Sequence, residues 1–166
     1  MPSEVIERRK VEDNVPYDIW VQRGLITVTE GNQNDFTLVT QWFLMMIRTY
    51  EIRPLWVGYD PWNSQYWTKE MEDLGFEMEK VRQGIYSLSE PMKQLEADLK
   101  NGNVIYNNNP IMKWNLSNTQ AKIDINGNIQ PSKLGSKYKR IDGAVALIIA
   151  YAVLNRYKLE YENLVK

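Results

Sequence analysis

Apolar side chains recur every three or four residues between positions 36 and 50, and this spacing predicts one amphipathic helix of about four turns. Asn34 or Asp35 can cap its first turn, and Pro54 prevents the chain from continuing as a helix. The positions that we expect to form a single buried stripe are Phe36, Val39, Trp42, Phe43, Met46, Ile47 and Tyr50.

Shorter apolar runs predict strands. The run at residues 55–57 looks like a buried strand, and it stops at Asp60 because Pro61 cannot donate a ladder hydrogen bond. The other segments of this kind are a β-like stretch at 25–29, a short alternating strand at 76–81, a short strand or extended loop at 103–110, and a hairpin turned at Asn126-Gly127.

The remaining helices follow from capping residues and breakers. They are residues 1–14 with Ser3 as N-cap, 63–74 ended by Gly75, 90–102 with Ser89 as N-cap and Pro91 in the first turn, and a long helix at 141–158. Helices that alternate with strands indicate an α/β layered fold. The length of 166 residues suits one domain, residues 1–166.

Composition narrows the possible chemistry. The chain has no cysteine and no histidine, which excludes disulfides, Cys/His zinc sites and every Ser-His or Cys-His catalytic pair. Carboxylates, Lys, Tyr or a hard metal held by oxygen atoms remain. The formal charge of −1 gives no global field that would attract nucleic acid. We find neither a spanning apolar run nor a signal-peptide core, so we expect a cytoplasmic protein.

Two acidic residues interrupt the apolar pattern. Asp60 ends a strand at the edge where ligands gather in α/β sheets, although Asp-Pro is also an ordinary turn. Asp142 projects from the same side as apolar residues of the last helix, and Gly143 and Ala144 leave space beside it. Taken alone, Asp142 is more simply an acid favoured by the helix dipole. Together, the two carboxylates could hold Mg²⁺ or Mn²⁺, which prefer carboxylate and water ligands.

A basic segment comes directly before Asp142. By itself such a run is usually a solvated loop, but beside a carboxylate metal site it would bind phosphate groups. The residues that we assign to phosphate binding are Lys122, Lys133, Lys137, Lys139 and Arg140, with Asn115 and Asn118 as further polar contacts. Together these signals indicate phosphodiester chemistry.

Several motifs together resemble one known family. They are "VPYDIWVQRGLITVTEGN", "VGYDPWN", "LGFEMEKVRQGIYSLSEPMKQLE", "NPIMKWNLSN", "NGNIQPSK" and "RIDGAVALIIA". In order and spacing, over nearly the whole chain, they resemble the large terminase subunit of tailed bacteriophages. That subunit is a DNA-packaging motor with an N-terminal ATPase and a C-terminal nuclease that cuts concatemeric double-stranded DNA.

The resemblance implies an RNase H-like mixed sheet flanked by helices, with Mg²⁺ or Mn²⁺ in a two-metal site. The family's strand-end acid falls on Asp60, and its acid at the start of the last helix falls on Asp142. Lys133 stands where the family often has a lysine. The family's first metal-binding aspartate lies on an opening strand, and nothing before Asp18 looks like that strand. The resemblance therefore implies a chain that begins after the opening strand, with weak or no activity alone.

The same resemblance implies partners that the chain does not contain. No G-x-x-x-x-G-K-[ST] loop occurs, so we expect no ATP site in this chain. A terminase ATPase portion, a small terminase subunit, a portal and double-stranded DNA would be its partners, in the host bacterial cytoplasm and from a phage or prophage gene. A sheet without its opening strand would also expose an edge through which copies could associate.

Two other interpretations stay open. The chain could be a catalytically inactive, truncated remnant that acts only as a folded or oligomeric interaction module. It could also be an unrelated α/β ligand-binding protein, which the absence of a Gly-rich phosphate loop disfavours.

Overall fold

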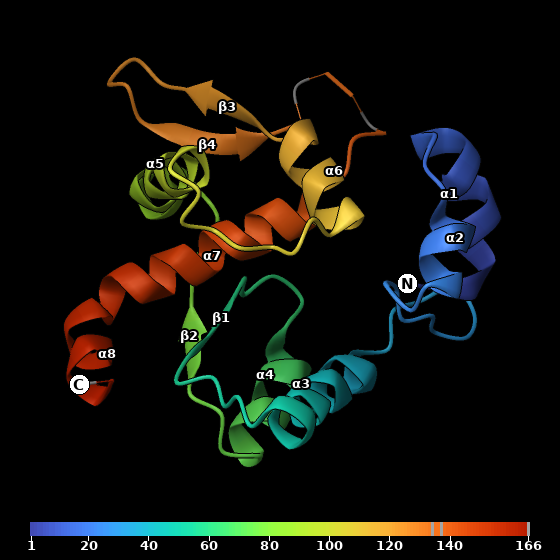
Figure 1. Ribbon diagram of the computed structural model, residues 1–166, viewed down its shortest axis with the longest axis horizontal. Coiled ribbons are helices and arrows are strands. Elements are labelled where there is room, and N and C mark those ends of the chain that lie inside the picture. Colours follow the sequence, from blue (N-terminus) through green and yellow to red (C-terminus); the bar gives the residue numbers. More distant parts are fainter. Residues whose placement is uncertain (134, 137, 166) are drawn as a thin grey trace. The chain divides into compact units, whose positions relative to one another are not determined.

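The structure, a computed structural model, describes residues 1–133, 135–136 and 138–165 (Figure 1). Its backbone forms two compact units, Met1–Arg53 and Pro54–Lys166. The single domain expected over residues 1–166 stays a prediction.

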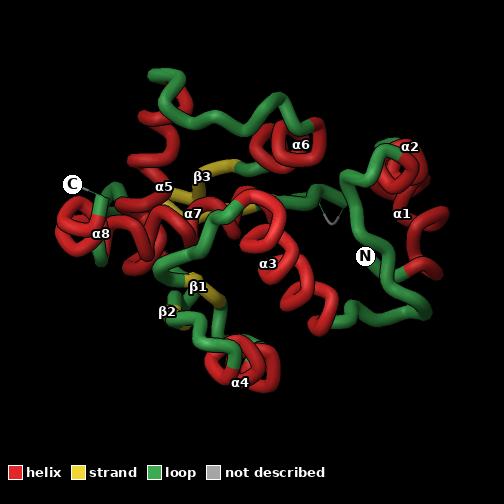
Figure 2. Tube along the Cα trace, turned by 60° about the horizontal axis from the view of Figure 1, so that its bottom comes forward, coloured by secondary structure: helices red, strands yellow, loops and turns green. Residues whose placement is uncertain are grey.

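The elements alternate as an α/β chain should, which confirms the predicted fold class, and the strands are short segments among many helices (Figure 2). The first unit contains a 3-10 helix η1 (Ser3–Val5), α1 (Ile6–Asp13), α2 (Tyr17–Gln22) and α3 (Phe36–Tyr50). The second contains β1 (Val57–Tyr59), α4 (Gln65–Asp73), β2 (Met78–Lys80), α5 (Ile85–Lys100), α6 (Pro110–Asn118), β3 (Gln120–Ile123), β4 (Ile129–Ser132), α7 (Asp142–Arg156) and α8 (Lys158–Leu164). No helix in the described part of the chain is long and apolar enough to cross a membrane.

Helix α3 confirms the predicted bounds but not the predicted burial. Asp35 caps it by accepting a hydrogen bond from the backbone N–H of Thr37 at 2.9 Å. Its only buried residue is Thr40, whereas Phe36 and Trp42 are 50% and 48% exposed. The expected buried stripe is therefore wrong. Periodicity identifies the apolar face of a helix, but burial also requires another element packed against that face.

The predicted strand at 25–29 is also wrong. Only Thr29 pairs, in an isolated parallel bridge with Pro2. The charged N-terminal segment is helical as expected, but it is divided between η1 and α1. Ser3 does not cap either helix, because its hydroxyl donates instead to the carbonyl of Gly31 at 3.5 Å.

Helix α7 is the centre of the second unit. Figure 1 shows β1 and β2 on one side of it, and α5, α6 and the β3–β4 hairpin on the other. Small and branched side chains make this possible, because they allow elements to approach the helix from both sides. The buried cluster around it consists of Val81, Leu88, Leu95, Ile148, Ile149, Ala152 and Val153.

Strands β1 and β2 are parallel, with Val57 opposite Met78 and Tyr59 opposite Lys80. Both predicted strands are present, and the first lies later than expected. Val57 is buried, but Leu55 is 41% exposed and precedes the strand.

The hairpin of β3 and β4 forms as predicted around Asn126-Gly127, with Ile123 opposite Ile129. The start of α5 was predicted wrongly, because the helix begins at Ile85 and contains Pro91 in its interior. Ser89 is buried within α5, and its hydroxyl accepts a hydrogen bond from the backbone N–H of Ile129 at 3.1 Å. Ser89 thus connects the helix to the hairpin instead of capping the helix.

Candidate metal and nucleic-acid site

Asp60 follows β1 directly and is half-buried. One carboxylate oxygen accepts a hydrogen bond from the backbone N–H of Trp62 at 3.1 Å, and the other accepts from the side-chain amide of Gln83 at 2.5 Å. Asp60 directly follows β1 and Gln83 lies three residues beyond the end of β2, and the carboxyl ends of parallel strands meet at one edge of a sheet. The fold therefore fixes the orientation of the Asp60 carboxylate.

Asp142 is the first residue of α7 and is exposed. It lies on the same side of α7 as the buried Ile149 and Val153, two and three turns later, as the apolar pattern predicted. An acid in the first turn is favoured by the positive end of the helix dipole, as expected.

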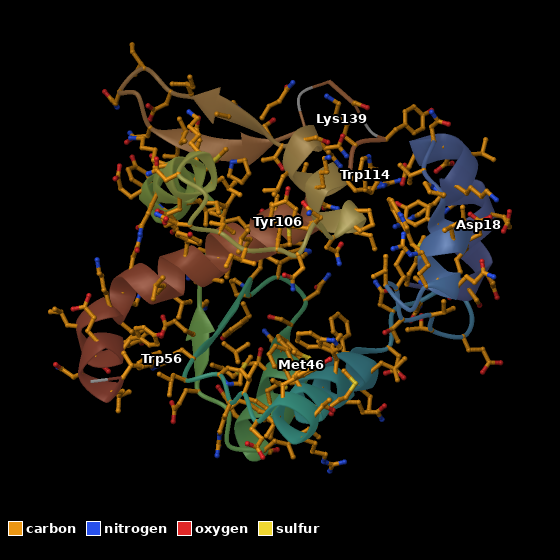
Figure 3. All side chains as sticks on the ribbon, viewed as in Figure 1. Asp18, Met46, Trp56, Tyr106, Trp114 and Lys139 are labelled. Carbon is orange, nitrogen blue, oxygen red and sulfur yellow. The ribbon has the colours of Figure 1, made fainter. Side chains whose placement is uncertain are left out.

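Strand β1 crosses the C-terminal half of α7 in the opposite direction to the helix. Before the strand lies Trp56, which is labelled in Figure 3. Its ring stacks on Tyr157 just beyond the end of α7, with ring centroids 4.5 Å apart and planes at 4°. Within the strand, a Cβ atom on Gly58 would lie 2.7 Å from Val153 Cγ2 and 2.8 Å from Ile149 Cγ2. The chain from 56 to 58 therefore advances toward the N-terminal end of α7.

This direction carries Asp60 toward Asp142. A strand advances about 3.3 Å per residue, so Asp60 lies roughly 7 Å beyond Gly58 along the strand. Asp142 precedes Ile149 by two turns, roughly 10 Å along the helix axis. The strand therefore carries the half-buried Asp60 in the direction of the N-terminal end of α7, where the exposed Asp142 begins the helix.

The space beside Asp142 is not empty. Ala144 is fully buried and its small side chain allows close packing. A Cβ atom on Gly143 would lie 3.4 Å from Asn115 Cγ, so the space at that glycine lies against an asparagine side chain. The two small residues that we interpreted as room for a ligand therefore have a packing role.

Lys133, Lys139 and Arg140 belong to the segment between β4 and α7, whereas Lys122 is on β3. Ser132, at the end of β4, is paired with Gln120, and the carbonyl of Arg140 accepts a hydrogen bond from Asn118 at 3.1 Å. Both ends of the loop are therefore anchored next to the C-terminal end of α6.

Among the residues assigned to phosphate binding, Lys122 and Lys133 are exposed, and Lys139 (Figure 3) and Arg140 are half-buried. Lys137 lies outside the described residues. Asn115 is buried, and both ends of its amide are hydrogen-bonded within the protein, so its predicted contact with phosphate is wrong.

The donor chemistry of Asp60 and Asp142 fits one hard divalent ion. Each carboxylate oxygen has two lone pairs, so Asp60 can accept its two hydrogen bonds and still ligate a metal. Hydrogen bonds of this kind orient metal ligands. In residues 1–133, 135–136 and 138–165, however, no group of three or more acidic side chains is placed to hold a metal. Asp60 and Asp142 alone therefore do not supply the ligands that a second metal ion would need.

Gln83 and the α6 asparagines were not recognised from sequence as supports of the two acids. For Gln83, the available signal was its position after a strand parallel to the one that ends at Asp60. For Asn115 and Asn118, their one-turn spacing on a helix would have placed them on one face, but that helix was not predicted.

An α/β unit with a strand-end carboxylate, a second carboxylate at a helix start and a basic loop beside it is typical of metal-dependent enzymes that act on phosphodiesters. The family model described as "Terminase large subunit, endonuclease domain" matches residues 1–156. The chain therefore belongs to the terminase large subunit nuclease-domain family.

Individual relatives agree with this assignment. The chain is 26% identical over 156 residues to "Terminase, large subunit" of Enterobacteria phage HK97, and 32% identical over 145 residues to "Protein YmfN" of Escherichia coli K12. These alignments cover 93% and 85% of this chain, but only 30% and 31% of the two relatives. The crystal structure of the HK97 large terminase has a TM-score of 0.82 at 25% identity, over 92% of this chain and 32% of that one. The chain thus spans about a third of the length of these relatives.

Proposed function

We propose that this chain is a metal-dependent endonuclease domain that cuts concatemeric double-stranded DNA, with Asp60 and Asp142 as the ligands of Mg²⁺ or Mn²⁺. The supporting observation is the course of β1 along α7, which carries Asp60 toward the end of the helix that begins at Asp142. Membership of the terminase nuclease-domain family supports the choice of DNA as substrate. The RNase H-like assignment belongs to the same proposal.

Each group has a definite role in this proposal. A bound Mg²⁺ or Mn²⁺ ion would supply charge stabilisation during displacement at phosphorus. Asp60 ligates with its carboxylate held by Gln83 and by the N–H of Trp62, so little orientational freedom is lost on binding. Lys133 and Lys139, on the loop before Asp142, hold DNA phosphates beside the carboxylates, and Lys122, Lys137 and Arg140 extend the same contact.

Nicking of supercoiled plasmid tests the assignment. With Mn²⁺, the chain should convert supercoiled DNA slowly to nicked circles, because only two carboxylates serve the metal. Asp60→Ala and Asp142→Ala should each abolish nicking. Asp73→Ala is the matched control, since Asp73 is an exposed acid at the end of α4 and should leave the rate unchanged.

Two results would contradict the nuclease assignment. One is nicking that persists at the wild-type rate in either site variant, which would identify a contaminating nuclease. The other is the absence of Mn²⁺-dependent nicking and of Mn²⁺ binding by the wild-type chain in calorimetry.

A second candidate function is an inactive interaction module, favoured by the absence of a three-acid group in the described part of the chain. Each of the two sheets there has only two strands, and strand edges can pair with another copy. Concentration-dependent mass in sedimentation, together with no nicking, would support this candidate.

As a terminase nuclease domain, the chain would act in the host bacterial cytoplasm. Its partners would be a terminase ATPase portion, a small terminase subunit and a portal. Copurification with each of these proteins would test that part of the proposal.

A further inference from the structure

The first turn of α7 is capped by a different helix. Its own N-cap residue, Ile141, has no polar side chain, and no side-chain hydrogen bond is made from that position. A helix start leaves backbone N–H groups that a cap normally satisfies. The missing acceptor comes from α6, where the side-chain oxygen of Asn115 accepts from the N–H of Gly143 at 2.9 Å.

Asn115 is held firmly enough to act as a fixed support. It is only 4% exposed, and its side-chain amide nitrogen donates to the carbonyl of Ile111 at 3.0 Å. The two hydrogen bonds need opposite ends of the amide, so they also fix which end faces α7.

A second asparagine holds the other side of the same turn. Asn118 follows Asn115 by three residues on α6, and side chains at this spacing share one face of a helix. Its amide nitrogen donates to the carbonyl of Arg140 at 3.1 Å. The backbone is thus held at residue 140 and at residue 143, and Asp142 lies between the two contacts.

We propose that Asn115 and Asn118 are positioning residues, which hold the backbone on both sides of Asp142 and so fix where its carboxylate meets a divalent metal ion. The proposal rests on the metal-binding role proposed for Asp142. Both side chains are neutral, so they restrain the acid without adding charge that would compete for the ion.

Substitutions that keep or remove single atoms of this arrangement provide the test. Asn115→Leu preserves approximate size but removes the acceptor, whereas Asn115→Asp retains an oxygen for the N–H of Gly143. Asn118→Leu removes the donor to Arg140 at a less buried position. Ser117→Ala is the matched control, because Ser117 is exposed on α6 and its hydroxyl bonds only within that helix.

Three measurements are made on each variant of the 166-residue chain: urea unfolding, backbone amide hydrogen exchange of Gly143 by NMR, and Mn²⁺ affinity by calorimetry. Asn115→Leu should accelerate exchange at Gly143 by at least ~10-fold, beyond any change at buried amides such as Ile148, and Asn115→Asp should retain most of the protection. Asn115→Leu and Asn118→Leu should each weaken Mn²⁺ binding by roughly 10-fold, at the lower end of effects seen when supports of metal ligands are removed. Ser117→Ala should change none of the three.

The outcomes separate this proposal from the proposed function. Exchange at Gly143 that is equal in Asn115→Leu and Ser117→Ala would overturn the holding role. Wild-type Mn²⁺ affinity in both leucine variants would overturn the positioning role, even if their stability falls. If Asn115→Leu does not fold, Asn118→Leu decides between these results. If the wild-type chain binds no Mn²⁺, the proposed function fails, the positioning role toward a metal fails with it, and exchange alone decides whether the asparagines hold the start of α7.

Discussion

Gly58 determines how closely β1 approaches α7. A Cβ atom at this position would meet methyl groups of Val153 and Ile149 at 2.7 and 2.8 Å, well inside ordinary contact. Both methyl groups are on β-branched side chains with stiff χ1 angles, so neither can move away easily. The glycine is therefore required by packing, and the position of Asp60 two residues later depends on it.

We predict that Gly58→Ala lowers the free energy of unfolding by about 1–3 kcal/mol, the usual cost of inserting a methyl group into a packed core. Urea denaturation followed by circular dichroism measures this change. The control is Gly143→Ala, where the nearest atom to the new Cβ is Asn115 Cγ at 3.4 Å. An alanine there should be neutral or stabilising by up to about 1 kcal/mol, because alanine favours a helix. Equal losses in the two variants would contradict the packing argument.

The β3–β4 hairpin is stabilised at its turn by one carboxylate. Asp124 accepts hydrogen bonds from the N–H of Asn128 at 2.8 Å, from its side-chain amide at 3.0 Å, and from the N–H of Asn126 at 2.9 Å. The side-chain hydrogen bond from Asn128 is the main cause that lowers the pKa of Asp124 below its ordinary value, against the opposing effect of burial. The backbone N–H groups and the charge of Lys93 lower it further.

This pKa shift predicts acid-sensitive loosening of the hairpin. Because the pKa is lower in the folded state, its stabilising effect is complete above the unfolded pKa of about 3.9 and is lost as the pH falls below it. Amide exchange at Asn128, whose N–H donates to Asp124, should therefore rise on acidification below about pH 4 beyond its intrinsic pH dependence. Asp124→Asn should remove this additional rise in exchange. Asp73→Asn, at an exposed acid on α4, should leave the rise unchanged. An excess that persists in Asp124→Asn would exclude Asp124 as the titrating group.

At the scale of elements, local signals in the sequence predicted what local interactions determine. The cap of α3 at Asp35, the turn at Asn126-Gly127 and the long apolar helix α7 were all found, since each depends on residues close together in the chain. Helix α6 was missed because its apolar side chains are spread around the helix and form no single apolar face, although Asn109 caps it through the N–H groups of Ile111 and Met112.

Elements whose form depends on distant contacts were predicted less well. Ser89 and Pro91 looked like a helix start, but Ser89 instead accepts a bond from Ile129, forty residues later. The same limit applies to the site: Asp60 and Asp142 stood out from their own segments, whereas Gln83 and Asn115 support residues on other elements. No spacing within a segment could have revealed those bonds.

At the scale of the whole molecule, charge is balanced overall but unevenly placed. The formal charge is −1, so attraction to DNA must come from a local surface. The loop between β4 and α7 supplies Lys133, Lys139 and Arg140, and its ends are anchored at α6. A local surface of this size implies few phosphate contacts and a moderate dependence of DNA binding on salt.

We predict that log K for a duplex of arbitrary sequence falls with log salt concentration with a slope of about −4, as expected for four or five neutralised phosphates. Fluorescence anisotropy with Ca²⁺ in place of Mn²⁺ measures binding without cleavage. The double variant Lys133→Ala/Lys139→Ala should reduce the magnitude of the slope by about two, one for each contact removed. The control Lys69→Ala/Lys158→Ala removes the same charge from exposed positions on α4 and α8, and it should retain the wild-type slope. Equal reductions in the two double variants would show that net charge, and not this loop, determines binding to DNA.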